Sequence, residues 1–255
     1  MDEEMIITDS DFRPHFIAYF DILGYKQHME KGRSVEIANK IASSIEGVWE
    51  NFDMRKYGGD VKIPEDEAKL KVFSDNFIIC SERDWHAVLQ NAIRVQMHLA
   101  LNDVLVRGSL CYGNLFFSNE FLSGEGIVLA HEIESQTAIY PRVVVDKLFM
   151  DEAQNQIDAH VERLRKKPHN QADFVKEMLD RELEYITIDF DGCMFVDYLK
   201  YEISSYEIQR HLPNDPNRET IKEILTLHRD NIARSANSSN RKISQKYQWC
   251  RNYHK

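Results

Sequence analysis

Short apolar runs that border single acidic residues are the clearest pattern in the chain. Residues 16–22 spell Phe-Ile-Ala-Tyr-Phe-Asp-Ile, and a second apolar run, 77–79, directly follows the tripeptide Ser-Asp-Asn. Apolar runs of this length predict buried strands when turn residues flank them. We therefore expect Asp21 near the end of one buried strand and Asp75 at the start of another.

The remaining pattern alternates between helical and strand signals. Apolar residues at helical spacing predict helices over 34–52 and 84–101, with Ser34 and Asp84 as N-cap candidates. The other predicted elements are a loop over 54–66, strands or hairpins over 69–80 and 104–117, a Gly-led turn and helix over 124–139, a strand over 142–146, a broken helix over 151–184, a strand pair over 185–198 and helix over 216–254.

This order of elements predicts the fold class. Strand, helix, two strands, helix and strand follow one another through the first half of the chain. The pattern predicts an α/β fold, an α+β sandwich in which helices cover a mixed or antiparallel sheet. Gly108 and Gly113 lie within the one or two strands predicted over 104–117, where we expect close approach of another backbone or a bulge.

Composition narrows the classes of partner. The 255 residues are 43% hydrophobic with a formal net charge of −10, which favours a sizeable core and disfavours a general nucleic-acid surface. No stretch approaches the roughly 20 apolar residues of a membrane span, and the acidic N-terminus does not resemble a signal peptide. The four cysteines form no C-x-x-C pattern. We expect a cytoplasmic protein with reduced thiols and with neither nucleic-acid nor membrane partners.

The two acidic residues have both a chemical and a structural interpretation. A buried carboxylate is costly unless it is paired or binds a metal, and two on neighbouring strands would form an oxygen-rich site for a hard cation. The alternatives are that Asp21 caps a turn, as is common in Asp-x-x-Gly, and that Asp75 belongs to a plain hairpin turn. Arg107 has a structural alternative too, as a salt-bridge partner.

Four motifs, in order, resemble those of the class III nucleotide cyclases. They are Asp21-Ile22-Leu23-Gly24-Tyr25, Phe73-Ser74-Asp75, Arg107-Gly108-Ser109-Leu110-Cys111-Tyr112-Gly113, and Gly124 followed by a helix with Ala130, Ile133, Glu134, Ser135 and Ala138. The segments Phe-Asp-Ile-Leu-Gly, Val-Arg-Gly-Ser-Leu and Tyr-Pro-Arg-Val-Val-Val-Asp are most similar to those of the pyrimidine cyclases of bacterial Pycsar antiphage systems. The resemblance implies a catalytic core over 1–148, with 149–255 supplying strands and extra C-terminal helices that complete and brace the same domain.

The resemblance also implies a function. Such enzymes are cytoplasmic homodimers that convert UTP or CTP into a 3′,5′-cyclic monophosphate and pyrophosphate. The cyclic nucleotide then activates a separate effector protein in antiviral defence. Two Mn²⁺ or Mg²⁺ ions per site would stabilise the attacking and leaving oxygens. Among the two substrates, UTP is our preference.

The family motifs assign roles to individual residues. Asp21, the Ile22 carbonyl and Asp75 are the implied metal ligands, and Asp21, Asp75 and Arg107 the implied catalytic residues. The turn formed by Ile22, Leu23, Gly24 and Tyr25 would hold phosphates through its backbone N–H groups. Lys71 is the implied base-reading residue, contributed across a dimer interface, and Phe121 stands where its acidic partner is usual.

Departures from the family pattern keep alternatives open. The family's transition-state asparagine and arginine fall on Val128 and Glu132. Either the charge is stabilised by another residue, such as Arg107 or Arg142, or the domain binds a nucleotide or a partner without catalysis. A purine cyclase is a third alternative, which the missing acidic partner of Lys71 weakens.

Other polar and aromatic residues are given structural interpretations. His131 and Glu132 lack a second histidine nearby and are not expected to bind a metal. Asp189 and Asp191 flank a predicted turn and are expected to be structural. The aromatic-rich stretch 245–254 is expected to be a packing helix.

Overall fold

The computed structural model describes residues 7–30, 32, 34–50, 69–73, 75–102, 104–118, 121–167, 171–200, 226, 229–230, 232–233 and 241–253. The strands are β1 Arg13–Ile22, β2 Lys69–Phe73, β3 Asn76–Ser81, β4 Val106–Phe117, β5 Leu122–Ser123, β6 Val143–Val145, β7 Ile186–Ile188 and β8 Met194–Val196. The longer α-helices among the described residues are α1 Tyr25–Glu30, α2 Ser34–Glu50, α3 Trp85–Leu101, α4 Glu125–Gln136, α5 Lys147–Arg165, α6 Ala172–Leu183 and α9 Arg241–Tyr253, and a short 3₁₀ helix spans Asp9–Asp11.

These strands form one eight-stranded sheet in the order β2-β3-β1-β4-β6-β8-β7, with β5 paired to β4. The first four strands are antiparallel to their neighbours and are connected through α2 and α3, which is the ferredoxin-like β-α-β-β-α-β arrangement. β6 joins β4 in parallel, β8 pairs with β6 antiparallel, and β7 pairs with β8 antiparallel. The expected α/β class, with a mixed, mostly antiparallel sheet covered by helices, is confirmed.

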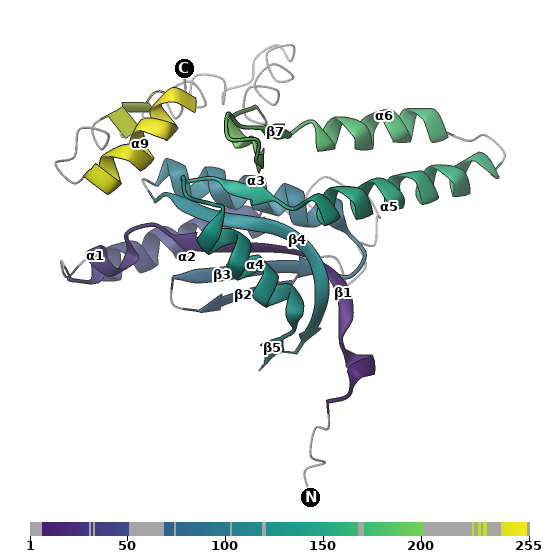
Figure 1. Cartoon of the computed structure of the whole chain (residues 1–255), viewed down its shortest axis with the longest axis horizontal. Helices are drawn as coiled ribbons and strands as arrows, with labels where there is room; N and C mark the ends of the chain where they lie inside the picture. The colour runs from purple at the N-terminus through teal and green to yellow at the C-terminus, as the bar shows by residue number, and fades with distance from the viewer. Residues whose placement is uncertain are drawn as a thin grey trace, which may run out of the picture.

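The alternation of side chains along β1 divides the core into two layers. Phe16, Phe20 and their even-numbered neighbours pack in the larger cluster with residues of α2, α3 and α5. Ile17 and Tyr19 belong to a smaller cluster with Ala130 of α4. Figure 1 shows α4 in front of the sheet, with α2 and α3 behind it. Successive strand side chains point to opposite faces, so the odd-numbered Asp21 lies on the α4 face.

Glycines let the backbones around this face approach closely. A Cβ on Gly108 would lie 2.1 Å from the carbonyl oxygen of Tyr19, and one on Gly113 would lie 2.9 Å from the Cα of Gly126. The expectation of close approach at Gly108 and Gly113 is therefore confirmed. Their role is to keep β1, β4 and α4 in contact.

Most predicted elements are confirmed, with two corrections. The helix predicted from 151 begins at Lys147, where Asp146 caps it through a 2.9 Å hydrogen bond from the backbone N–H of Leu148. On α2, Val35 is 74% exposed, whereas Ile37 and Ile41 face the core. The predicted loop 54–66 lies outside the described residues, as does most of the helical region predicted before α9. Within the described residues, no helix is both long and apolar enough to span a membrane.

Candidate active site

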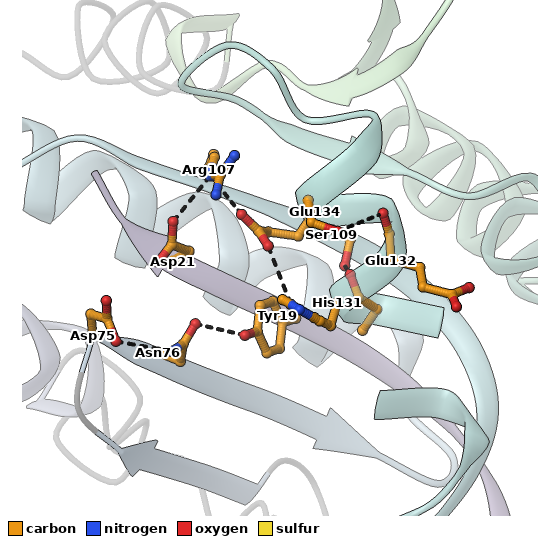
Figure 2. A network of polar contacts seen from close by, with 11 residues as sticks. Tyr19, Asp21, Asp75, Asn76, Arg107, Ser109, His131, Glu132 and Glu134 are labelled. Carbon is orange, nitrogen blue, oxygen red and sulfur yellow. Dashed lines mark hydrogen bonds and ion pairs between the residues drawn. The ribbon is translucent and has the colours of Figure 1, made fainter. Parts of the chain in front are cut away.

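Residues from three neighbouring strands meet at the end of β1 on the face covered by α4. Asp21 lies opposite Asn76 of β3 and opposite Arg107 of β4. Directly opposed residues of antiparallel strands share a face, so their side chains lie next to one another. Figure 2 shows this group, with Glu134 reaching toward it from α4.

Arg107 lies between two carboxylates. Its Nε donates a hydrogen bond of 3.0 Å to Asp21 Oδ2 and lies 2.5 Å from Glu134 Oε1. Because Nε carries a single hydrogen, which points to Asp21, Glu134 Oε1 is in ion-pair contact but accepts no hydrogen bond from the described residues. Glu134 Oε2 lies 3.4 Å from His131 Nδ1. The side chains of Asp21, Arg107 and Glu134 are 19%, 25% and 2% exposed.

The buried carboxyl of Glu134 is electrostatically perturbed. Burial removes water from the charged form and raises the pKa of Glu134, and the charge of Asp21 adds to this rise. The charges of Arg107 and His131 oppose it. Glu134 thus compensates the charge of Arg107 at the cost of its own desolvation.

Sequence reasoning placed Glu134 within a motif but gave it no functional role. The available signal was the four-residue spacing of Gly126, Ala130 and Glu134, which are the buried positions of α4. Residues four apart lie on the same face of a helix. Because the two small residues of this face pack against the sheet, the acidic residue that follows them also faces the sheet.

Asp75 lies in the turn between β2 and β3, on the other side of Asp21. Its Oδ1 accepts a 3.0 Å hydrogen bond from Asn76 Nδ2, and Asn76 Oδ1 accepts a 2.6 Å bond from the Tyr19 hydroxyl. The Asp75 carbonyl accepts a 3.0 Å bond from the backbone N–H of Ile22. Burial, followed by the negative charges of Glu134, Asp21 and Asp75, raises the pKa of Tyr19 to about 12. Tyr19 therefore remains a neutral hydrogen-bond donor.

The two aspartates fit a hard divalent cation by their donor chemistry. Asp21 Oδ1 and Asp75 Oδ2 accept no hydrogen bond from the described residues, so each carboxylate has one oxygen available. Within the described residues, no group of three or more His, Cys, Asp or Glu side chains could form a metal cage. Mg²⁺ is commonly held by one or two carboxylates together with water and substrate phosphates, which is the donor set that this site offers.

The turn after Asp21 is more restricted than predicted. The N–H groups of Ile22 and Leu23 donate to backbone carbonyls at 3.0 and 2.9 Å, so they are not available to a phosphate. Gly24 has a φ of 78°, a conformation that glycine adopts without strain. The predicted contact through the N–H groups of Ile22 and Leu23 is therefore wrong, and phosphate contact by Gly24 and Tyr25 stays a prediction.

Lys71 and Phe121 lie by the β4–β5 hairpin. Lys71 Nζ donates a 2.9 Å hydrogen bond to the Ser118 carbonyl and lies 5.4 Å from the centroid of the Phe117 ring. Phe121 is 49% exposed, and its ring centroid is 6.1 Å from that of Phe116. The hairpin is at the opposite end of β4 from the Asp21 group. Base contact by Lys71 and Phe121 stays a prediction for a dimer.

Arg142 does not belong to this site. It is fully buried, and its guanidinium is paired with Asp189 and Asp191. The expectation that Arg142 could stabilise charge on a reacting phosphate is therefore wrong, whereas the structural interpretation of the two aspartates is confirmed. The side chains of Val128 and Glu132 are exposed on α4.

Comparisons with known proteins give little further information. No protein-family model matches the chain, and no curated protein matches it. Among solved structures, a bacterial light-regulated adenylyl cyclase is similar at 13% identity and a TM-score of 0.38. The match covers 68% of this chain and 57% of that chain, so the chain spans little more than half of that structure. At this level of similarity, no conclusion about activity passes from that protein to this chain.

Proposed function

We propose that the protein is a metal-dependent nucleotide cyclase that converts UTP, or CTP, into the 3′,5′-cyclic monophosphate and pyrophosphate. The observation that supports this most is the convergence of Asp21 and Asp75 at the end of β1. Each has one carboxylate oxygen without a hydrogen bond from the described residues, and both lie beside the glycine turn. Asp21 and Asp75 are distant from each other in the sequence, so it is the fold that brings them together.

The chain's own residues would bind and orient the substrate. Asp21 and Asp75 would hold Mn²⁺ or Mg²⁺, with the Ile22 carbonyl as a further ligand. Bound ions of this kind stabilise charge on the attacking and leaving oxygens of a phosphoryl transfer. The N–H groups of Gly24 and Tyr25 would bind phosphate oxygens of the substrate. Arg107 fixes the Asp21 carboxylate through its 3.0 Å hydrogen bond.

The proposal also includes the base of the substrate and the assembly of two protomers. In a homodimer, Lys71 and Phe121 of one protomer would contact the base bound at the aspartates of the other. Phe121 offers an apolar ring where the family's purine enzymes have an acid, which favours the smaller pyrimidine. The product would activate a separate effector in cytoplasmic antiviral defence.

A second candidate is a nucleotide-binding module without turnover. The exposed face of α4 carries Val128 and Glu132 at the positions of the family's asparagine and arginine, so it supplies neither transition-state group. In that case a nucleotide would bind, no product would form, and Asp21→Ala would leave binding unchanged. A purine cyclase would be revealed by the identity of its product.

The proposal is tested by supplying purified protein with Mn²⁺ and each of the four nucleoside triphosphates in turn. We expect a cyclic pyrimidine product, and we expect Asp75→Asn to abolish it while circular dichroism stays unchanged. Asp146→Asn is the matched control, because asparagine also caps the start of α5. Equal activity of Asp75→Asn and Asp146→Asn would refute the assignment of the metal site, and a cyclic purine product would refute the base assignment.

A further inference from the structure

A pocket outside the candidate active site lies between α9, the segment after α4 and the β7–β8 turn. Its volume is about 540 Å³. This is within the range of about 300–1,000 Å³ that is usual for small-molecule sites. Its aromatic lining comes from Tyr140, Phe190 and Trp249. None of these residues takes part in the Asp21 group.

The aromatic side chains form a stacked pair with a third, exposed ring beside it. The rings of Tyr140 and Trp249 are nearly parallel, with an interplanar angle of 10° and centroids 5.8 Å apart. The Phe190 ring is inclined by 55° to that of Tyr140, with centroids 5.8 Å apart. Phe190 is 76% exposed. The exposed Phe190 ring can stack on a planar ring of a ligand.

The stacked pair of Tyr140 and Trp249 is held in place before any ligand arrives. The guanidinium carbon of the buried Arg142 lies 5.3 Å from the Tyr140 ring centroid and 5.9 Å from that of Trp249. Asp189 and Asp191 pair with this guanidinium, and Asp189 Oδ2 also accepts a 2.7 Å hydrogen bond from Trp249 Nε1. A surface fixed in this way loses little conformational entropy on binding.

The polar part of the pocket comes from α9. It consists of three amides, Gln245, Gln248 and Asn252, and the ammonium group of Lys246. Amides both donate and accept hydrogen bonds, as the edges of a nucleobase do, and an ammonium group binds phosphate. None of the described residues that line the pocket carries a carboxylate, although the whole chain has a net charge of −10. This favours an anionic ligand over a cationic one.

We propose that this pocket binds a nucleoside monophosphate. The base stacks on the exposed Phe190 ring beside the stacked pair of Tyr140 and Trp249, the α9 amides contact its polar edge, and Lys246 pairs with the phosphate. The pocket is close to the turn after Asp21, because Leu23 packs in the same apolar cluster as Trp249. It shares no side chain with that site, so the proposal does not depend on the proposed cyclase activity.

The test titrates the full chain with UMP and AMP in the presence of EDTA, which removes divalent cations from the Asp21 site. Binding is followed by calorimetry and by the tryptophan fluorescence of the chain. We expect saturable binding that Phe190→Ala weakens by at least about fivefold, the scale of one lost base–aromatic contact. Phe174→Ala, which truncates an equally apolar side chain 61% exposed on α6, should bind as the wild type does. Both phenylalanines are exposed, so neither change threatens the fold.

Two further arms separate this proposal from the cyclase. Binding should persist in Asp21→Asn and Asp75→Asn, whose turnover is expected to be lost. Uridine should bind more weakly than UMP. The proposal is overturned if neither nucleotide binds, if Phe190→Ala and Phe174→Ala bind equally, or if Asp21→Asn abolishes binding. Equal affinity for uridine and UMP would overturn the assignment of Lys246 to the phosphate.

Discussion

Replacing Glu134 with glutamine tests the charge balance around Asp21. In the folded protein the positive charge of Arg107 lies 3.0 Å from Asp21 Oδ2 and 2.5 Å from Glu134 Oε1. The three side chains together carry one net negative charge. Glu134→Gln keeps the shape but removes that net charge, so Arg107 fully offsets Asp21. We expect divalent cations to bind more weakly.

The size of the effect follows from Coulomb's law. One unit charge about 4 Å from another is worth about 1 kcal/mol in bulk water and about 4 kcal/mol at an effective dielectric constant of about 20. The side chains of Asp21 and Arg107 are 19% and 25% exposed, so solvent screens part of the interaction and the lower part of this range applies. A loss of about 1.4 kcal/mol corresponds to about tenfold weaker binding.

The assay is calorimetric titration of Mn²⁺ into each purified variant. Glu132→Gln, which removes the same charge from an exposed position of α4, is the control and should bind as the wild type does. The double variant Arg107→Gln with Glu134→Gln should recover most of the lost affinity, because the positive charge that offsets Asp21 is gone. The reasoning fails if Glu134→Gln and Glu132→Gln bind Mn²⁺ equally, or if the double variant binds no better than Glu134→Gln.

Three further predictions concern the stability of the folded protein. Gly108→Ala places a Cβ 2.1 Å from the Tyr19 carbonyl oxygen, so urea denaturation should show a loss of at least about 1–3 kcal/mol, and an unchanged midpoint would contradict the close packing. Arg142→Gln leaves two aspartates without their buried partner and should cost about 3–5 kcal/mol in the same assay; a cost below about 1 kcal/mol would show that the pair is dispensable. Burial lowers the pKa of His15 below its ordinary value of 6.5. The stability that neutral His15 contributes is therefore fully present above pH 6.5 and is lost as the pH falls through the pKa of the folded state. His15→Gln should therefore flatten the fall in unfolding free energy between about pH 7.5 and 5, and an unaltered slope would assign that fall to other groups.

Local sequence patterns were sufficient to predict much of the fold. The apolar run of β1 and the helical spacing of α3 each depend on neighbouring residues, and the Asp84 cap was predicted and is present, as its side chain accepts a 2.8 Å hydrogen bond from Ala87 N. The face of α2 was assigned less well. Val35 fits the helical spacing as well as Ile37 does, and only the packing of α2 on the sheet decides which is buried.

The contacts between distant elements could not be predicted. Arg107 was singled out by its motif, but its shared position between Asp21 and Glu134 depends on the register of β4 and on the docking of α4. The N–H groups of Ile22 and Leu23 were expected to be available, because the sequence does not show which hydrogen bonds the backbone of a turn makes. Arg142 was misjudged for a similar reason, since its partners Asp189 and Asp191 arrive from a distant hairpin.

The central claim is that Asp21 and Asp75 form the metal site of a nucleotide cyclase. The most direct measurement is the mass spectrum of the products formed from UTP and Mn²⁺ by the wild type and by Asp21→Asn, with both proteins shown to be folded. We predict cyclic UMP and pyrophosphate from the wild type and neither from Asp21→Asn. The absence of a cyclic product from UTP, CTP, ATP and GTP with folded wild-type protein would contradict the claim, and so would an equal yield from Asp21→Asn.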